Sequence, residues 1–98
     1  MSHPAPRSLD VAALGEAMLE FNQTQTEPPL YLQGFGGDTS NAAIAAARAG
    51  ARVAYLSRLG QDHWGHLLMQ LWAREGVDTR GIVRDAQAPS GVYFVSHD

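Results

Sequence analysis

The 98-residue chain contains no cysteine, and its seven basic residues are all arginine. Without cysteine, the protein has neither a disulfide framework nor a thiolate metal site. Without lysine, the G-x-x-x-x-G-K-[ST] loop that cradles nucleotide phosphates is excluded. No stretch of about 18 consecutive apolar residues occurs, so we expect no transmembrane helix and no membrane partner.

Charge is sparse and nearly balanced. Ten acidic residues against seven scattered arginines give a net charge of −3. Because nucleic-acid surfaces need clustered basic side chains, we expect no nucleic-acid partner. Residues 1–8 are polar, contain two prolines and lack the apolar stretch of a secretory signal. We therefore predict a disordered tail over 1–8, a single domain over 9–98 and a cytoplasmic protein.

Short apolar runs predict the strands. Leu9–Leu14 and Val53–Leu59 are each closed by a glycine and read as buried strands. Residues 18–21 and 30–35 are predicted to be further short strands. The polar, proline-containing stretch 22–29 between them is predicted to be a loop.

Two helices have clear start and stop signals. The alanine-rich stretch 39–49 ends at Gly50, a residue suited to a left-handed cap. The second helix begins after Asp62, a good N-cap, and ends at Gly76, after which Val77 can fold back on the last turn. Its apolar residues recur with helical spacing and form one buried stripe, so its tryptophans are predicted to be core residues: Trp64, Leu67, Leu68, Leu71 and Trp72.

Two more short strands are predicted at 81–84 and 91–96, joined by a turn over 85–90. Strands that alternate with helices predict an α/β fold with a largely parallel sheet. The flanking strands near 16–35 and 81–98 are expected to form a small separate β flap, or lid.

The most informative stretch is Gly36-Gly37-Asp38-Thr39-Ser40-Asn41, directly before the first helix. Paired glycines let the backbone turn sharply and let a ligand approach the main chain. A helix that starts there directs its free N–H groups at that ligand, and the amide of Asn41 lies one turn further on. These features predict a site for a polyhydroxylated or anionic small molecule. The alternative is a strand–turn–helix junction without a ligand.

Other chemistries fit less well. A dinucleotide fingerprint starting at Gly34 fails because its third glycine falls on Thr39 and no acidic residue closes the second strand. His63 and His66 have a spacing that metal ligands use, but no third ligand is apparent nearby. We predict that both are solvated residues beside the apolar stripe, and that the chain holds no metal.

The segment GGDTSNAAIAAARAGARVAYLSRLGQDHWG, residues 36–65, resembles the first signature of ribokinase-like (phosphofructokinase B) sugar kinases. The signature's glycines, asparagine and G-x-D-x-x-G motif fall on Gly36, Gly37, Asn41, Gly50, Gly60, Asp62 and Gly65. The resemblance covers nearly the whole chain from Leu9 onward. Three strings, GEAMLEF, FGGDTSN and SGVYFVSHD, most resemble 2-keto-3-deoxygluconate kinases, while fructokinases and ribokinase share the general frame.

The resemblance implies a ribokinase-like fold and phosphoryl transfer from ATP, with Mg²⁺, to a sugar acid, giving 2-keto-3-deoxygluconate 6-phosphate. It implies that Gly36, Gly37 and Asn41 contact the sugar acid, that Tyr93 is a lid tyrosine and that Glu20 is an acidic sugar ligand. It also suggests homo-oligomers joined through the flap.

The family's catalytic aspartate lies in a G-A-G-D-like motif that this chain does not contain, and the nucleotide-binding half is also missing. We therefore expect no catalytic residue here and hypothesise that the chain is part of a larger enzyme, inactive by itself. Two alternatives stay open: a non-catalytic sugar-binding or regulatory module, and a structural α/β piece that pairs through its flap. For Tyr93, the alternative is a strand residue packed on its neighbours.

Overall fold

The computed structural model describes residues 9–97, so the tail predicted over 1–8 lies outside the described residues. The elements follow in the order β1 (Val11–Leu14), β2 (Met18–Gln23), β3 (Tyr31–Gly36), α1 (Asp38–Arg48), β4 (Val53–Gly60), α2 (His63–Arg74), β5 (Ile82–Asp85) and β6 (Gly91–Val95). Within these residues, neither α1 nor α2 has the length and hydropathy of a membrane-spanning helix.

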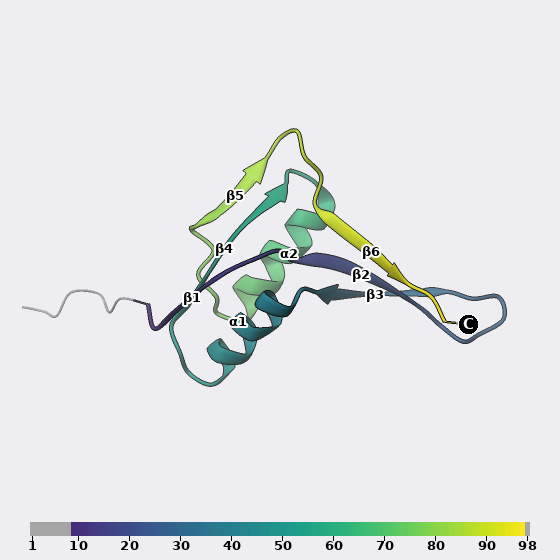
Figure 1. Cartoon of the computed structure of the whole chain (residues 1–98), viewed down its shortest axis with the longest axis horizontal. Helices are drawn as coiled ribbons and strands as arrows, with labels where there is room; N and C mark the ends of the chain where they lie inside the picture. Colours follow the sequence, from purple (N-terminus) through teal and green to yellow (C-terminus); the bar gives the residue numbers. More distant parts are fainter. Residues whose placement is uncertain (1–8, 98) are drawn as a thin grey trace, which may run out of the picture.

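The strands form two sheets of three strands each (Figure 1). The main sheet has the order β1-β4-β5 and is parallel throughout. The flap sheet has the order β3-β2-β6, in which β2 is antiparallel to β3 and parallel to β6. The predicted α/β architecture, with a mainly parallel sheet, flanking helices and a β flap, is confirmed. The flap extends from the main sheet as an arm (Figure 1).

One strand lies in a different sheet from the one predicted. Residues 81–98 were assigned as a whole to the flap, and this assignment is wrong for β5. That strand pairs in parallel with β4, from Ser57 opposite Ile82 to Gly60 opposite Asp85. Because α2 connects β4 to β5, the chain makes a strand–helix–strand crossover, which places the two strands side by side in one sheet. Only β6 continues into the flap.

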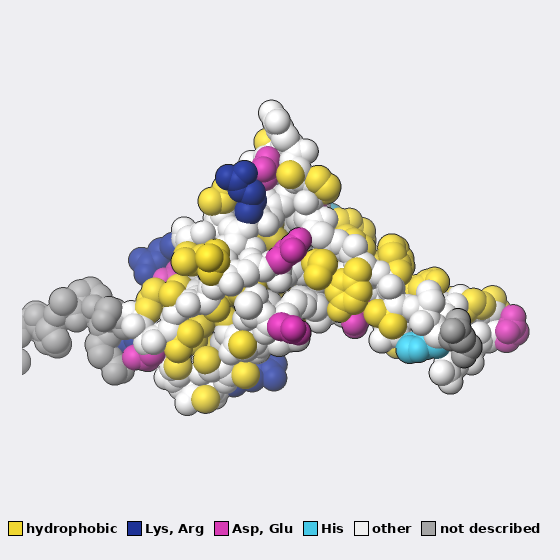
Figure 2. All heavy atoms as spheres, viewed as in Figure 1, with side chains coloured by type: hydrophobic (Ala, Val, Ile, Leu, Met, Phe, Trp, Pro, Cys, Tyr) yellow, Lys and Arg dark blue, Asp and Glu magenta, His cyan; other side chains and the backbone are white. Residues whose placement is uncertain are grey.

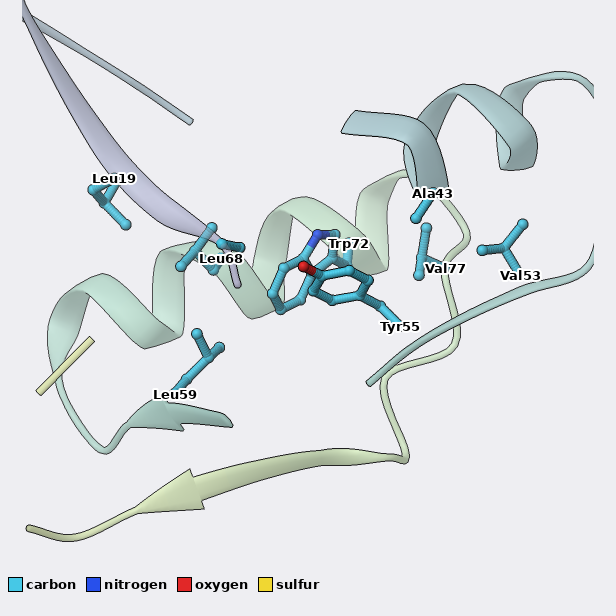
Figure 3. Packing of buried hydrophobic residues seen from close by; sticks show 9 residues of the cluster. Leu19, Ala43, Val53, Tyr55, Leu59, Leu68, Trp72 and Val77 are labelled. Carbon is cyan, nitrogen blue, oxygen red and sulfur yellow. The ribbon is translucent and has the colours of Figure 1, made fainter. Parts of the chain in front are cut away.

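The core lies where α1 and α2 meet β4 and the base of the flap (Figure 3). Trp72 is fully buried, as predicted, and its ring lies 4.8 Å from that of Tyr55. The Trp72 Nε1–H group donates to Ser40 Oγ at 2.8 Å, and the Tyr55 hydroxyl lies 2.8 Å from Thr39 Oγ1. Buried aromatic polar groups need such partners. Two residues of the glycine-rich stretch therefore anchor the first turn of α1 to the core.

The ends of α2 match the sequence signals. Asp62 Oδ1 accepts a hydrogen bond from the Gly65 N–H group at 2.7 Å, as an N-cap should. Gly76 has a positive φ of 74°, and the Val77 N–H group donates to the carbonyl of Trp72 at 2.9 Å. This pair completes the predicted Schellman closure, with Val77 buried in the core.

The prediction that the first strand is buried is wrong, although the strand itself is present as β1. Leu14 is 75% exposed and lies beside the exposed Leu56. The reason is alternation: Tyr55 points to the face that the helices cover, so its neighbour Leu56 points to the opposite face. That face, which also carries the exposed Val83 opposite Arg58, is uncovered by α1 and α2.

Candidate functional site

The two faces of the flap sheet have different surroundings. Leu19 and Phe21 of β2 point toward α2, where Leu19 is fully buried and the Phe21 ring meets the Trp64 ring edge-on at 5.6 Å. The residue between them, Glu20, lies opposite Gly34 of β3 and Tyr93 of β6. Since successive side chains alternate between faces, these three positions share the face that points away from α2.

Glu20 and Tyr93 form the central pair of this face. The Tyr93 hydroxyl donates to Glu20 Oε1 at 2.7 Å. The pKa of Tyr93 lies above its ordinary value, first because of this hydrogen bond, then because of desolvation and the negative charges of Glu20 and Asp38. Tyr93 therefore stays a neutral phenol, able to donate one hydrogen bond, well beyond neutral pH.

Gly36 lies beneath the ring of Tyr93. A Cβ atom at this position would lie 2.3 Å from the Tyr93 hydroxyl oxygen, so only glycine leaves room for the ring. Gly37 is needed for two other reasons: its φ is 111°, and a Cβ there would lie 2.6 Å from the carbonyl oxygen of Glu16. Close packing thus accounts for both glycines, and their contact with a ligand stays a prediction.

The start of α1 adjoins this pair. Gly37 occupies the N-cap position and has no side chain with which to cap the first turn. The N–H groups at such an end are free to bind hydroxyl or anionic groups. Asp38 is the first residue of the helix, and its negative charge contributes to raising the pKa of Tyr93. Sequence reasoning did not select Asp38 as a site residue, although an acid directly after the glycine pair was the available signal.

Asn41 occupies a different surface from the Glu20–Tyr93 pair. Its side chain is exposed and lines a hollow of about 590 Å³ together with Phe35, Ile44, Ala45, Arg48 and Leu71. Phe35 belongs to the α2-facing side of the flap sheet, because it lies opposite Leu19. The structure thus brings together Glu20, Tyr93 and Gly36, with Gly37 next in the chain, and the role of Asn41 stays a prediction.

The two histidines lie at the start of α2, where the His63 ring contacts the Trp64 ring at 5.1 Å. Among residues 9–97, no group of three or more His, Cys, Asp or Glu side chains is placed to hold a metal ion. The candidate site is therefore built from one carboxylate, one phenol and the amides of the glycine-rich turn.

Comparison with known protein families assigns the chain to one of them. Residues 8–98 match the family described as pfkB family carbohydrate kinase. The chain belongs to this family. The resemblance predicted from residues 36–65 is confirmed.

Individual pfkB relatives act on different sugars. The 2-dehydro-3-deoxygluconokinase of Thermoproteus tenax is 34% identical over 96 residues, and fructokinase-1 of Oryza sativa subsp. japonica is 36% identical over 97 residues. Each match covers 94% of this chain but 30% of the relative, so the chain spans about a third of the length of these enzymes. Similar identities to both kinds of kinase leave the sugar unassigned.

Solved structures confirm the ribokinase-like fold. A fructokinase from Xylella fastidiosa superimposes with a TM-score of 0.85 at 35% identity, covering 90% of this chain and 28% of the fructokinase. A second structure of that fructokinase contains bound ATP and gives a TM-score of 0.83.

Proposed function

We propose that this chain forms the sugar-binding part of an ATP-dependent carbohydrate kinase, with 2-keto-3-deoxygluconate as the substrate and the 6-phosphate as the product. The observation that carries the proposal is the Glu20–Tyr93 pair over Gly36, on the flap face that α2 does not cover. Family membership supports the reaction, and the similarity to the T. tenax kinase supports the substrate.

Each group of the site has a role in the proposal. The Glu20 carboxylate accepts hydrogen bonds from sugar hydroxyls, while the Tyr93 hydroxyl both donates and accepts. The main-chain amides around Gly36 and Gly37 bind the carboxylate of the sugar acid at the positive end of α1. Asn41 is included on the family resemblance, because in this structure its side chain lines the separate hollow beside Phe35. Phosphoryl transfer depends mainly on such positioning, and closure of the flap keeps water from the transferring group.

Charge favours a second candidate, phosphorylation of a neutral ketose such as fructose. Glu20 and Asp38 both act on Tyr93, and the flap segments 16–36 and 91–97 contain no arginine. In the view of Figure 2, the dark blue basic side chains lie on the broad part of the molecule rather than on the flap arm. Carboxylates attract hydroxyl donors but repel another carboxylate. A neutral sugar can therefore bind here without the electrostatic repulsion that a sugar acid experiences.

The donor and catalytic groups belong, in this proposal, to parts of a kinase outside these residues. The chain has no G-A-G-D-like string, and its described residues offer no donor set for Mg²⁺. ATP as the phosphoryl donor is supported by the X. fastidiosa fructokinase that contains it. We expect the 98-residue chain to bind sugar without phosphorylating it, and place the whole enzyme in the cytoplasm, where ATP is available.

We also propose that copies of the chain associate through the flap. Leu32 and Phe94 are 66% and 65% exposed, and Tyr31 is 46% exposed, on strands at the two edges of the flap sheet. Exposed apolar edge strands are prone to pairing. Sedimentation equilibrium should give a dimer that Leu32→Glu converts to a monomer; a monomeric wild type would contradict this proposal.

Two assays test the function. Calorimetric titration of the chain with 2-keto-3-deoxygluconate and with fructose measures sugar binding and should separate a binding part from a purely structural one. A coupled ATP assay on a complete kinase carrying this segment measures transfer. Turnover of the keto acid supports the first candidate, turnover of fructose alone supports the second, and sugar binding without turnover indicates a non-catalytic module.

A further inference from the structure

The G-x-D-x-x-G motif, Gly60 to Gly65, surrounds the residue at which the chain enters the flap strand β6. That residue, Ser90, is 7% exposed. Asp62 Oδ2 accepts from the Ser90 N–H group at 2.8 Å, and Asp62 Oδ1 accepts from the Ser90 hydroxyl at 2.8 Å. The Ser90 oxygen in turn accepts from the Gly60 N–H group at 3.0 Å. One carboxylate and one hydroxyl thus join the end of β4, the start of α2 and the start of β6.

The glycines of the motif allow this junction to close. A Cβ atom on Gly65 would lie 2.4 Å from the Gly60 carbonyl oxygen and 2.9 Å from Ser90 Oγ. A Cβ atom on Gly60 would lie 2.4 Å from Asp62 Oδ2 and 2.7 Å from the Ser90 nitrogen. Arg84 of β5 closes the remaining side, where its Nε–H group donates to the Gly60 carbonyl at 3.0 Å. Any side chain at either glycine would force the three elements apart.

The junction lies next to the strand that carries Tyr93, so it bears on the geometry of the flap. Tyr93 is three residues beyond Ser90, on the strand that begins directly after it. The contact between Tyr93 and Glu20 therefore depends on where β6 begins.

We propose that Asp62 and Ser90 form a clasp that fixes β6 against the main sheet and thereby positions Tyr93 for sugar binding. Asp62 is in this sense a positioning residue of the candidate site, because it holds the strand without touching the sugar. The consequence for sugar binding rests on the proposed function, whereas the consequence for the flap does not.

Asp62 caps α2 and also binds Ser90, and one substitution can separate these two roles. Asparagine is as good an N-cap as aspartate, so Asp62→Asn keeps the bond from the Gly65 N–H group. The amide has a single acceptor oxygen, so its NH₂ group must face the Ser90 N–H group, donor to donor. The variant therefore keeps the cap of α2 and the bond from the Ser90 hydroxyl, both made to Oδ1, and loses the bond from the Ser90 N–H group to Oδ2, which weakens the clasp. Ser90→Ala removes the hydroxyl bonds from the other side, and Asp78→Asn, the same change at an aspartate paired with Arg80, is the control.

Hydrogen exchange on the whole 98-residue chain tests the clasp. Loss of a hydrogen bond to a charged group should raise amide exchange across β6 by about tenfold or more in Asp62→Asn and in Ser90→Ala. The amides of α2 should be unchanged in Asp62→Asn, and all amides of the flap should be unchanged in Asp78→Asn. Equal exchange in β6 of wild type and Asp62→Asn would overturn the clasp, as would faster exchange of α2 and β6 together, which indicates a cap alone.

Calorimetry with the same proteins tests the link to the sugar. We expect Asp62→Asn to weaken binding of the preferred sugar by about tenfold, since β6 no longer holds Tyr93 in place. Unchanged affinity despite faster exchange in β6 would overturn the positioning role. A wild type that binds neither sugar, with β6 still loosened by Asp62→Asn, would refute the proposed function and leave the clasp standing.

Discussion

Replacing Gly36 with alanine is expected to separate sugar binding from folding. The added Cβ atom would lie 2.3 Å from the Tyr93 hydroxyl oxygen and 2.6 Å from Tyr93 Cε1. Both distances are well below van der Waals contact, so the ring must move by about 1 Å or more. A movement of that size breaks the 2.7 Å hydrogen bond to Glu20. Because the ring tip is only partly buried and Gly36 has no positive φ, unfolding should become easier by no more than about 1 kcal/mol.

Gly34→Ala is the matched control for this variant. Gly34 lies on the same strand and face, but its added Cβ atom would lie 3.4 Å from Glu20 Oε2, an acceptable contact. We expect Gly36→Ala to lower sugar affinity by about tenfold or more and Gly34→Ala to change it little, measured by calorimetry. NMR titration of the labelled Tyr93 ring should show its pKa falling toward the ordinary tyrosine value in Gly36→Ala alone. Wild-type affinity and an unshifted Tyr93 pKa in Gly36→Ala would refute the reasoning.

Three further predictions follow from the fold and the site. Asn41→Ala should weaken sugar binding by about 1–3 kcal/mol by calorimetry with the circular dichroism spectrum intact, and unchanged affinity would remove Asn41 from the site. Trp72→Ala should destabilise the protein by about 3–5 kcal/mol in urea denaturation, because it empties the core and leaves the Ser40 hydroxyl without its partner; a variant that unfolds normally but loses binding would contradict the core assignment. Partial burial would raise the pKa of Asp62, but the bonds from Ser90 and Gly65, together with nearby Arg84, lower it overall. A carboxylate whose pKa is lowered by folding stabilises the protein above the unfolded pKa of about 3.9, and this stability is lost as the pH falls through the folded value. The free energy of unfolding of the wild type should therefore fall more on acidification than that of Asp62→Asn. Parallel plots of unfolding free energy against pH for the two proteins would contradict this.

The features that the sequence predicted well are those set by neighbouring residues. The α2 helix was predicted with its N-cap at Asp62 and its closure at Gly76 and Val77, because caps and helical spacing act within a few residues. The double glycine at Gly36 was found for the same reason. The reason that position 36 needs glycine was not predicted, because the Tyr93 ring that packs on it comes from a strand far along the chain.

The features that were missed depend on distant partners. The apolar residues of β5 do not indicate which sheet the strand will join. It joins the main sheet because it pairs with β4. The apolar run of β1 predicted burial, but Leu14 lies on a face that neither helix covers. The bonds of Thr39 and Ser40 to Tyr55 and Trp72 join three elements, so no local pattern indicates them.

The central claim is that the flap face carrying Glu20, Tyr93 and Gly36 binds a sugar. The most direct test is NMR titration of the labelled chain with 2-keto-3-deoxygluconate and with fructose. We predict that one sugar shifts the amide signals of Gly36, Gly37 and Tyr93 in a saturable way and leaves those of the opposite face, such as Phe21, unchanged. Shifts confined to the opposite face, or no saturable shift with either sugar, would contradict the claim.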